Sequence, residues 1–376
     1  MPGTNNLFVG LMSGTSVDAI DAVLVRFTDN PAGIEFLAML EHPFPDELRD
    51  EIHQLIENSR SVDLDQLGSL DRRLGLLYAE AVQNLLTKAG TRPEQVTAIG
   101  NHGQTMRHRP DALPPFTMQI GDAATIANTC KITTVADFRS ADIALGGQAA
   151  PLAPAFHQWL FGSNDTAGAV INIGGIANIT VMQPDSPLLG YDTGPGNTLL
   201  DAWFRNHNNA AYDHDGQWAA TGSPIEKLLG AMLADPYFSL PSPKSTGREY
   251  FNSAWLNSHL SDCNLTLVPA DIQATLTELT AVSIANAIKT HQENGSVWLC
   301  GGGALNPYLR ERLASHLAGI TVDTTASLGI EPGWVEAATF AWLARERLHG
   351  NAVGPSTVTG ASHSAVLGSI HLPPKP

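Results

Sequence analysis

The sequence predicts a mixed α/β protein built from two halves. Short runs rich in β-branched residues alternate with longer stretches whose apolar residues recur at helical spacing. Both halves open on the same pattern, a strand, a glycine-rich turn and a second strand, at residues 7–27 and again at residues 169–182. Chains of this class bind their ligand in a cleft beside the loops at strand ends. We therefore expect two lobes, at residues 1–145 and 146–376, with the tail from residue 350 packing back on the first.

The elements of the first half follow from local signals. A helix is expected from Pro45, since proline and acidic residues favour a helix start, and a longer one ends at Gly90, since glycine favours a helix end. The predicted strands are 7–12, 20–27, 34–40, 96–100 and 132–136, and the predicted helices are 45–59, 64–89 and 151–160.

The second half shows the same mixture. A turn-rich segment, Asp192–Asn197, leads into an amphipathic helix, and the tail from Val353 has little periodicity. The predicted strands are 169–173, 176–182 and 297–300, and the predicted helices are 198–204, 271–290, 307–317 and 334–348.

Composition excludes several classes of protein. Asp and Glu number 37 against 21 Lys and Arg, a net charge of −16, so binding to nucleic acid through a broad basic surface is not expected. Three widely spaced cysteines argue against a disulfide scaffold and suit a reducing cytosol. The N-terminus lacks the basic and apolar pattern of a signal peptide, and no apolar run is long enough to span a membrane. A cytoplasmic protein is expected.

Three glycine clusters each follow a β-branched run. Glycine there can serve a left-handed backbone or a bulge, or it can let backbone N–H groups approach an anion. The first cluster also carries hydroxyls and carboxylates, which suit phosphate and Mg²⁺. The clusters are residues 13–21, 172–178 and 301–306. The chain has no Gly-Lys pair and hence no P-loop motif, and no complete G-x-G-x-x-G.

Polar side chains gather at a few other points. Asp192, before a Gly-Pro-Gly sequence, is either an ordinary turn residue or a general base held in place. Arg139 could grip a carboxylate with two hydrogen bonds. Glu336 either faces solvent or points into the cleft. Residues 244–249 are either an anion site or a capped helix start. A further polar loop holds His102, Gln104, Thr105 and Arg107.

Ten segments in order along the chain resemble the anhydro-N-acetylmuramic acid kinase family. They run from Gly10 to Ala344. They read GLMSGTSVDAIDAVLV, NHGQTMRHRP, QIGD, ADFRSADIALGGQAAPLAP, INIGGIANIT, YDTGPGNTLLDAW, KSTGREYFN, DIQATLTELTA, CGGGALNP and EAATFAWLA.

The resemblance implies a fold and a reaction. The fold is the two-lobed actin/hexokinase/Hsp70 type, a duplicated ribonuclease H-like architecture with a cleft between lobes. The reaction converts ATP, water and 1,6-anhydro-N-acetylmuramic acid to N-acetylmuramic acid 6-phosphate and ADP, in the recycling of cell-wall sugars, and a homodimer is expected.

The resemblance also implies roles for particular residues. Asp192 is the expected base, and Arg139 is a candidate partner of the substrate's lactyl carboxylate. Asp18 is a candidate ligand of Mg²⁺, with Asp192 and Glu336 as open alternatives. Expected ATP-binding residues are Gly14, Thr15, Ser16, Val17, Asp18, Ala19, Ile20, Asp21, Gly174, Gly175, Asn178, Gly301, Gly302 and Gly303. Expected sugar-binding residues are His102, Gln104, Thr105, Arg139 and Glu336.

The sequence departs from the family pattern at three places. Ala19 and Ala149 stand where the family usually has glycine, and Met12 stands where many proteins of the wider fold have aspartate. The added methyl groups restrict the backbone at positions 19 and 149.

Two other functions stay open at this stage: a kinase of a hexose or amino sugar with a free hydroxyl, and a sensor that binds nucleotide or sugar without turnover.

Overall fold

The chain forms two compact units, each with its own sheet and core. A computed structural model describes residues 6–14, 17–29, 32–57, 62–162, 168–183, 186–208, 210–242, 244–248, 250–263, 268–354 and 356–374. The first unit comprises Met1–Ser163 and Glu336–Pro376, and the second comprises Asn164–Val335. The predicted boundary between two lobes, at residues 145 and 146, stays a prediction.

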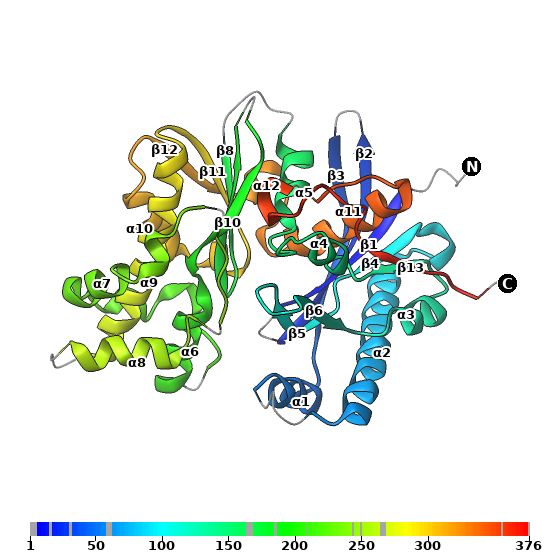
Figure 1. Cartoon of the computed structure of the whole chain (residues 1–376), viewed down its shortest axis with the longest axis horizontal. Helices are drawn as coiled ribbons and strands as arrows, with labels where there is room; N and C mark the ends of the chain where they lie inside the picture. Colours follow the sequence, from blue (N-terminus) through cyan, green and yellow to red (C-terminus); the bar gives the residue numbers. More distant parts are fainter. Residues whose placement is uncertain are drawn as a thin grey trace. The chain divides into compact units, whose positions relative to one another are not determined.

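The first unit is built on a six-stranded sheet (Figure 1). Strands β1, β2 and β3 form an antiparallel meander, β4 and β7 run parallel to β1, and β13 pairs antiparallel with β7. The order across the sheet is β13-β7-β4-β1-β2-β3. The strands are β1 (Leu7–Ser13), β2 (Ala19–Asp29), β3 (Ala32–Pro43), β4 (Ala98–Asn101), β7 (Thr134–Ala136) and β13 (Ser369–His371).

The second unit repeats this topology. Strands β8, β9 and β10 form an antiparallel meander, and β11 and β12 run parallel to β8, in the order β10-β9-β8-β11-β12. Apart from the added β13, both sheets follow the order third, second, first, fourth, fifth strand. This repeat confirms the duplicated ribonuclease H-like class. The strands are β8 (Gly168–Ile173), β9 (Ile176–Met182), β10 (Leu189–Pro195), β11 (Gly295–Cys300) and β12 (Ile320–Thr324).

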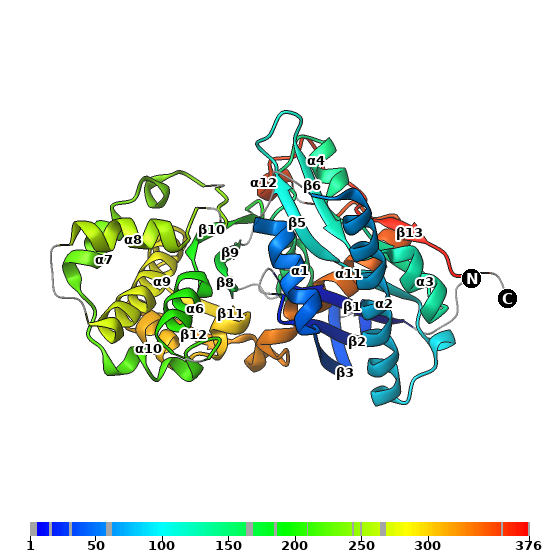
Figure 2. The ribbon, with the colours of Figure 1, turned by 90° about the horizontal axis from the view of Figure 1, so that it is seen from below.

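Two helices cover opposite faces of the first sheet (Figures 1 and 2). Helix α2 (Leu64–Ala89) packs its buried leucines against Val9 and Leu11, and ends at Gly90 with φ 61°. Helix α11 (Val335–His349) lies on the other face, directly over Gly10 and Gly100. A Cβ at Gly10 would lie 1.9 Å from the carbonyl oxygen of Ala337, so this close approach requires glycine.

Smaller elements complete the first unit. A two-stranded hairpin, β5 (Gln104–Arg109) and β6 (Phe116–Ile120), follows β4. The remaining helices are α1 (Asp46–Glu57), α3 (Ala123–Cys130), α4 (Ser140–Ala144), α5 (Ala153–Phe161) and α12 (Ser356–Thr359).

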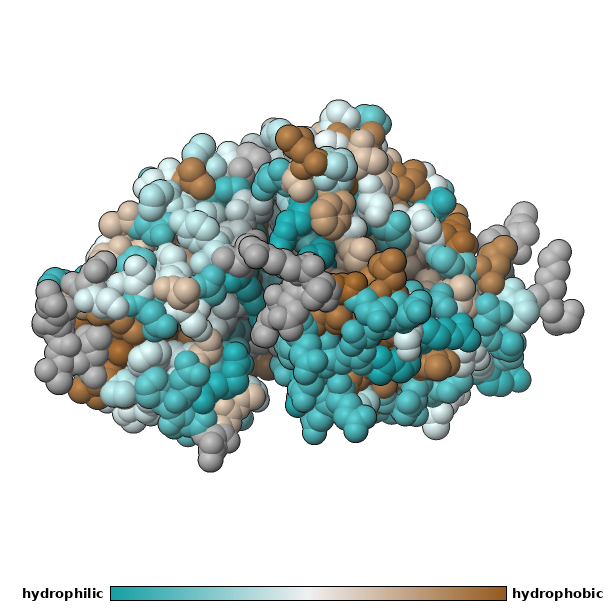
Figure 3. Space-filling model, turned by 60° about the horizontal axis from the view of Figure 1, so that its bottom comes forward, coloured by the Kyte–Doolittle hydropathy of each residue, from teal (hydrophilic) through white to brown (hydrophobic). Residues whose placement is uncertain are grey.

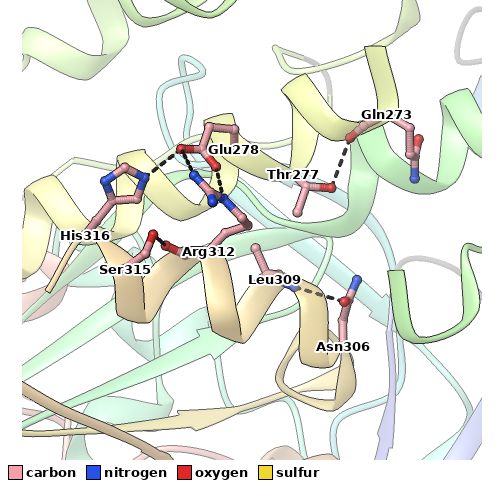
Figure 4. Close-up of polar contacts among 8 residues, drawn as sticks. All are labelled: Gln273, Thr277, Glu278, Asn306, Leu309, Arg312, Ser315 and His316. Atoms are coloured by element: carbon pink, nitrogen blue, oxygen red, sulfur yellow. Dashed lines mark hydrogen bonds and ion pairs between the residues drawn. The ribbon is translucent and has the colours of Figure 1, made fainter. Parts of the chain in front are cut away.

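The long helix α9 (Pro269–His291) organises the second unit. Its C-terminal half packs Ile284 and Ile288 on the sheet, and its N-terminal half packs Leu276 among helices α6 (Asn197–His207), α7 (Glu226–Leu233) and α8 (Ser253–Asp262). In Figure 4, Glu278 of α9 accepts hydrogen bonds from Arg312 and pairs with His316, which ties α9 to α10 (Pro307–Ser315).

One face of the described residues is drawn in Figure 3. On the face drawn in Figure 3, hydrophilic side chains predominate and apolar ones form small separate groups. None of the helices in the described part of the chain is long and apolar enough to cross a membrane. The three cysteines are buried free thiols.

Several expectations about local structure are wrong. Gln104, Thr105 and Arg107 lie on strand β5, not in a loop, because β6 pairs with that segment. Asp192 lies in strand β10, not in a turn, because β10 pairs with β9 in spite of its glycines and proline. Asp142 lies on α4.

Candidate active site

The first glycine cluster forms the turn between β1 and β2. Val17 has a left-handed backbone, φ 59°, and its N–H donates to the Gly14 carbonyl at 3.3 Å. Thr15 and Ser16, both expected at ATP, lie outside the described residues. Below the turn, the buried Ser13 hydroxyl contacts Tyr78 Oη at 2.5 Å and donates to Gln104 Oε1 at 2.9 Å. The start of this turn is therefore anchored in the core.

Gln104 is fully buried beneath that turn. Its Nε2 donates to the Gly14 carbonyl at 3.4 Å. Its neighbour Thr105 is partly buried and accepts a hydrogen bond from Gln119 at 3.2 Å. The described contacts of Gln104 thus support the glycine turn, and its role toward a sugar stays a prediction.

Two carboxylates interact beside the turn. Burial raises the pKa of Asp21 to about 7, and the nearby charges of Glu336 and then Glu41 add to the rise. Glu336 stands in the first turn of α11 and is partly buried. Glu336 therefore lies near another carboxylate of the first unit, and its expected direction toward the cleft stays a prediction. Asp18 is exposed at the start of β2, and Ala19 and the buried Ile20 are the first residues of that strand.

Arg139 and His102 form a hydrogen-bonded pair. Arg139 Nε donates to His102 Nε2 at 3.1 Å, and Arg139 Nη1 donates to the Ala149 carbonyl. Burial and then the Arg139 charge hold the pKa of His102 well below its ordinary value, so the imidazole is neutral and can accept this bond. Burial lowers the pKa of Arg139 to about 10, while Glu336 and Asp142 oppose that effect. Arg139 is therefore still a cation at neutral pH.

The loop that carries Ala149 is held by Asp142. The buried carboxylate accepts the Ala149 N–H at 2.6 Å and the Thr359 hydroxyl at 2.7 Å. Ala149 has a left-handed backbone, φ 53°, which explains why glycine is usual at this position. Alanine is accommodated here with its N–H and its carbonyl both hydrogen-bonded, so the loop keeps its contact with Arg139.

In the second unit, the Gly174-Gly175 turn joins β8 to β9. The N–H groups of Asn197 and Thr198, at the start of α6, donate to its carbonyls at 2.8 and 3.1 Å. Neither glycine has a positive φ. A Cβ at Gly175 would lie 2.8 Å from Thr198 Oγ1 and 3.2 Å from Arg248 Nη2. Close approach of these side chains therefore explains Gly175.

In the third cluster, Gly301–Gly303, the reason for glycine differs from one position to the next. Gly301 has φ 79°, and a Cβ there would lie 2.3 Å from Asn172 Oδ1. A Cβ at Gly303 would lie 2.3 Å from a methyl carbon of Ile173. A Cβ at Gly302 would lie 3.8 Å from Asn197 Nδ2, an ordinary contact, and Gly302 is exposed. Backbone conformation and packing thus explain two of these glycines, and the expected contact of Gly302 with ATP stays a prediction.

Asp192 lies on edge strand β10, where the pairing with β9 shifts register. Its cross-strand partner is Asn178, which itself pairs with Asn172 on β8. Partner residues in adjacent strands point to the same face, so the three polar side chains form a row across the sheet. Asp192 Oδ2 accepts the Thr246 N–H at 3.0 Å. The carboxylate is thus fixed by a backbone donor.

Two residues that contact or pair with Asp192 carry buried polar atoms without a hydrogen-bond partner among the described residues, Asn178 Oδ1 and Thr246 Oγ1. A third such atom, Thr198 Oγ1, lies beside Gly175. Unsatisfied buried polar atoms are costly, and a ligand rich in oxygen can satisfy them. Thr198 and Thr246 were not among the site residues expected from sequence, because threonine in a helix start or a loop is too common to stand out.

Residues 244–249 do not act as a helix start. Helix α8 begins at Ser253, and its cap is Asn252, which accepts the Ala254 and Trp255 N–H groups at 2.9 and 3.0 Å. Lys244 Nζ donates instead to the carbonyls of Tyr237 and Phe238. Glu249 lies outside the described residues.

A family model for anhydro-N-acetylmuramic acid kinase matches residues 6–373. The chain belongs to this family. Two relatives named anhydro-N-acetylmuramic acid kinase show how closely its members agree. The relative from Saccharophagus degradans is 49% identical over 98% of this chain and 99% of its own length. The relative from Coxiella burnetii is 48% identical over 97% of each chain.

Some solved structures that are similar to this chain are far more distant in sequence. One is the activator of the 2-hydroxyisocaproyl-CoA dehydratase from Clostridium difficile, 13% identical over 91% of this chain and 96% of that chain, with a TM-score of 0.44. The assignment to the family therefore rests on sequence, and the fold class rests on the repeated strand order.

Proposed function

We propose that the chain is an ATP-dependent kinase that opens 1,6-anhydro-N-acetylmuramic acid with water and phosphorylates it at O6. Family membership over nearly the whole chain carries the reaction class. The observation that carries the chemistry is Asp192, whose carboxylate is fixed by a backbone N–H beside Asn178 and Thr246. A carboxylate oriented in this way is suited to remove a proton from water.

The substrate determines the rest of the mechanism. Its 1,6-anhydro bridge leaves no free 6-hydroxyl, so the ring must open as the phosphoryl group is transferred. Asp192 takes a proton from water, the water oxygen bonds to C1, and the C1–O6 bond breaks. O6 then bonds to the γ-phosphorus, the bond to the β-phosphate oxygen breaks, and ADP leaves. Positioning and charge stabilisation supply most of the catalysis in such transfers.

Arg139 is proposed to bind the lactyl carboxylate of the sugar. Its guanidinium is held by His102 and the Ala149 carbonyl and remains charged at neutral pH. The roles of Gln104, Thr105 and Glu336 toward the sugar, and of the three glycine clusters toward ATP, are part of the same proposal.

Mg²⁺ fits the carboxylates of the first unit. Asp21 and Glu336 are close enough for Glu336 to raise the Asp21 pKa, and a divalent cation relieves such repulsion. Among the described residues, no group of three or more His, Cys, Asp and Glu could hold a metal by itself. Mg²⁺ in kinases is held by one or two carboxylates together with phosphate oxygens, which suits Asp21 and Glu336 better than the exposed Asp18. Bound there, Mg²⁺ would offset negative charge on the phosphates.

A coupled ADP-release assay tests this function. ADP release should require both Mg²⁺ and 1,6-anhydro-N-acetylmuramic acid, and the product should be heavier than the substrate by one phosphoryl group and one water. Activity on a free-hydroxyl hexose or amino sugar, with no water added, would identify the alternative kinase. Nucleotide or sugar binding without turnover would identify a sensor.

Asp192→Asn tests the proposed base. The amide cannot accept the proton, so turnover should fall by about 10³-fold or more, while ATP affinity measured by calorimetry stays similar. Turnover close to that of the unmodified chain would contradict the role of Asp192.

A homodimer and a cytoplasmic location also stay predictions. Light scattering measures the oligomeric state.

A further inference from the structure

A single segment of the second unit contacts Asp192 at three atoms. We call the described residues 235–242 and 244–246 the strap. Tyr237 Oη donates to the Asp192 carbonyl at 2.7 Å, and the Asp192 N–H donates to the Lys244 carbonyl at 3.0 Å. The Thr246 N–H donates to Asp192 Oδ2 at 3.0 Å. The strap therefore fixes both the backbone and the carboxylate of one residue.

The position of β10 explains why these contacts matter. Among the strands that the structure describes, β10 is at the edge of its sheet, with a neighbouring strand on one side only. At Asp192 its pairing with β9 shifts register before Gly194. An edge strand at an irregularity has more backbone freedom than a central strand. The strap supplies the hydrogen bonds that a further strand would otherwise make.

Lys244 holds the two parts of the strap together. Its ammonium donates to the carbonyls of Tyr237 and Phe238 at 2.9 and 3.2 Å, at the end of the 3₁₀ turn η4 (Pro236–Ser239). It also lies 4.6 Å from the centre of the Tyr237 ring. This cation thus stabilises both the turn and the tyrosine that contacts Asp192.

Asp235 and an aromatic cluster fix the base of the strap. The Asp235 carboxylate accepts the Tyr237 N–H at 2.8 Å, the Tyr250 hydroxyl at 2.8 Å and Trp255 Nε1 at 2.9 Å. The Tyr237 ring packs edge-on against the fully buried Phe251, with 5.4 Å between ring centres. Tyr237 is therefore held in place from its backbone to its ring, which leaves its hydroxyl little freedom.

The hydroxyl of Tyr237 stays protonated over the working pH range. Burial raises its pKa far above the ordinary value, and the Asp192 charge adds to the rise. It therefore remains a hydrogen-bond donor to the Asp192 carbonyl.

We propose that the strap orients Asp192 for catalysis and that Tyr237 is a positioning residue acting through Asp192. This inference rests on the proposed function, in which Asp192 is the base. It assigns catalytic importance to Tyr237 and Lys244, which touch neither the sugar nor the nucleotide in the proposed mechanism.

Tyr237→Phe tests the role of the hydroxyl. The ring and its packing are kept, and only the donor to the Asp192 carbonyl is lost, so kcat should fall about tenfold with KM for both substrates nearly unchanged. Tyr212→Phe is the control. It removes the hydroxyl of an exposed tyrosine of the second unit that lies outside the strap and its aromatic cluster, so kcat should stay within about twofold of the parent.

A double-mutant cycle separates positioning from general damage. Tyr237→Phe should leave the residual rate of Asp192→Asn unchanged when that rate is measured at high enzyme concentration, because the two residues act as one unit. Lys244→Met tests the strap without removing the Tyr237 hydroxyl. It should lower kcat without changing KM, since it releases the carbonyls of the turn but leaves the Tyr237 hydroxyl in place.

The outcomes distinguish this inference from the function on which it rests. Equal kcat values for Tyr237→Phe and Tyr212→Phe would overturn the role of the strap alone, as would an equal loss of rate from Tyr237→Phe with and without the Asp192 carboxylate. Near-normal turnover by Asp192→Asn would overturn the proposed base and the strap together.

Discussion

At the scale of single residues, the structure makes Arg139 an oriented cation. His102 is neutral and accepts from Nε, while the Ala149 carbonyl accepts from Nη1. Asp142 holds the Ala149 loop in the left-handed conformation that brings its carbonyl to Arg139. Arginine serves here because its planar group can satisfy two fixed acceptors and still present N–H donors to a ligand.

Arg139→Lys should weaken sugar binding selectively. Lysine keeps the charge but cannot hold both acceptors and a carboxylate, so we expect KM for the anhydro sugar to rise about 10- to 100-fold, with KM for ATP changed far less. Steady-state kinetics measure both KM values, with one substrate varied while the other is at a saturating concentration. Arg109→Lys is the control, since Arg109 is exposed on the β5–β6 hairpin and contacts the carbonyl of its neighbour His108. An equal rise in both KM values for Arg139→Lys would contradict the proposed contact.

At the scale of elements, a strong periodicity of apolar residues was sufficient to predict a helix or strand. A weak periodicity was not. Helix α2 covers the predicted residues 64–89, because its leucines recur at helical spacing and Gly90 ends it in a left-handed conformation. Strand β10 was missed because glycine and proline usually indicate a turn, and its pairing with β9 prevails over that tendency. The β5–β6 hairpin was missed for a different reason. Its polar strands pair with each other and do not follow an apolar pattern.

The link between α9 and α10 predicts a pH-dependent stability. Glu278 is only 5% exposed. Burial alone would raise its pKa, but hydrogen bonds from Arg312 and His316 outweigh burial and the pKa falls below 4.5. Figure 4 shows Arg312 on α10 and His316 directly after its end, both facing α9. An acid whose pKa is lowered in the folded state adds stability above its unfolded pKa, and that stability is lost as the pH falls through the folded value.

Glu278→Gln should therefore destabilise the protein at pH 7 by about 1–3 kcal/mol, and by less as the pH falls below about 4.5. Denaturant unfolding followed by circular dichroism at several pH values measures this difference. Glu35→Gln is the matched control, since Glu35 pairs with Arg26 at an exposed site and such pairs contribute little. A free-energy difference that is the same at every pH would show that the charge of Glu278 is not responsible.

At the scale of the whole molecule, the first unit is assembled from two separate stretches of chain. Residues 336–376 provide α11, which packs on Gly10 and Gly100, and β13, which extends the sheet beside β7. Thr359 of the tail donates to Asp142, so the tail also supports the loop of Arg139. The second unit is one continuous stretch with its own sheet and apolar clusters.

Fragments of the chain should therefore behave differently. Residues 164–335 should fold alone, because their sheet and core are complete within that stretch. Residues 1–163 should aggregate or remain unfolded, because the sheet face that α11 covers would be left open. Cooperative thermal unfolding and resistance to proteolysis report the folded state. Co-expression of residues 336–376 with residues 1–163 should restore a folded unit, and a folded 1–163 fragment without them would contradict this account.

The sequence by itself determined the α/β class, the two hairpin-led halves and the family, because apolar periodicity, glycine turns and ordered motifs are local properties of the chain. It also indicated Asp192 and Arg139 as residues of interest. Only the tertiary structure decided what surrounds them. The strap reaches Asp192 from more than 40 residues away in the chain, and Thr359 reaches Asp142 across 217 residues. Contacts of this kind depend on how distant segments pack, and no local pattern of residues encodes them.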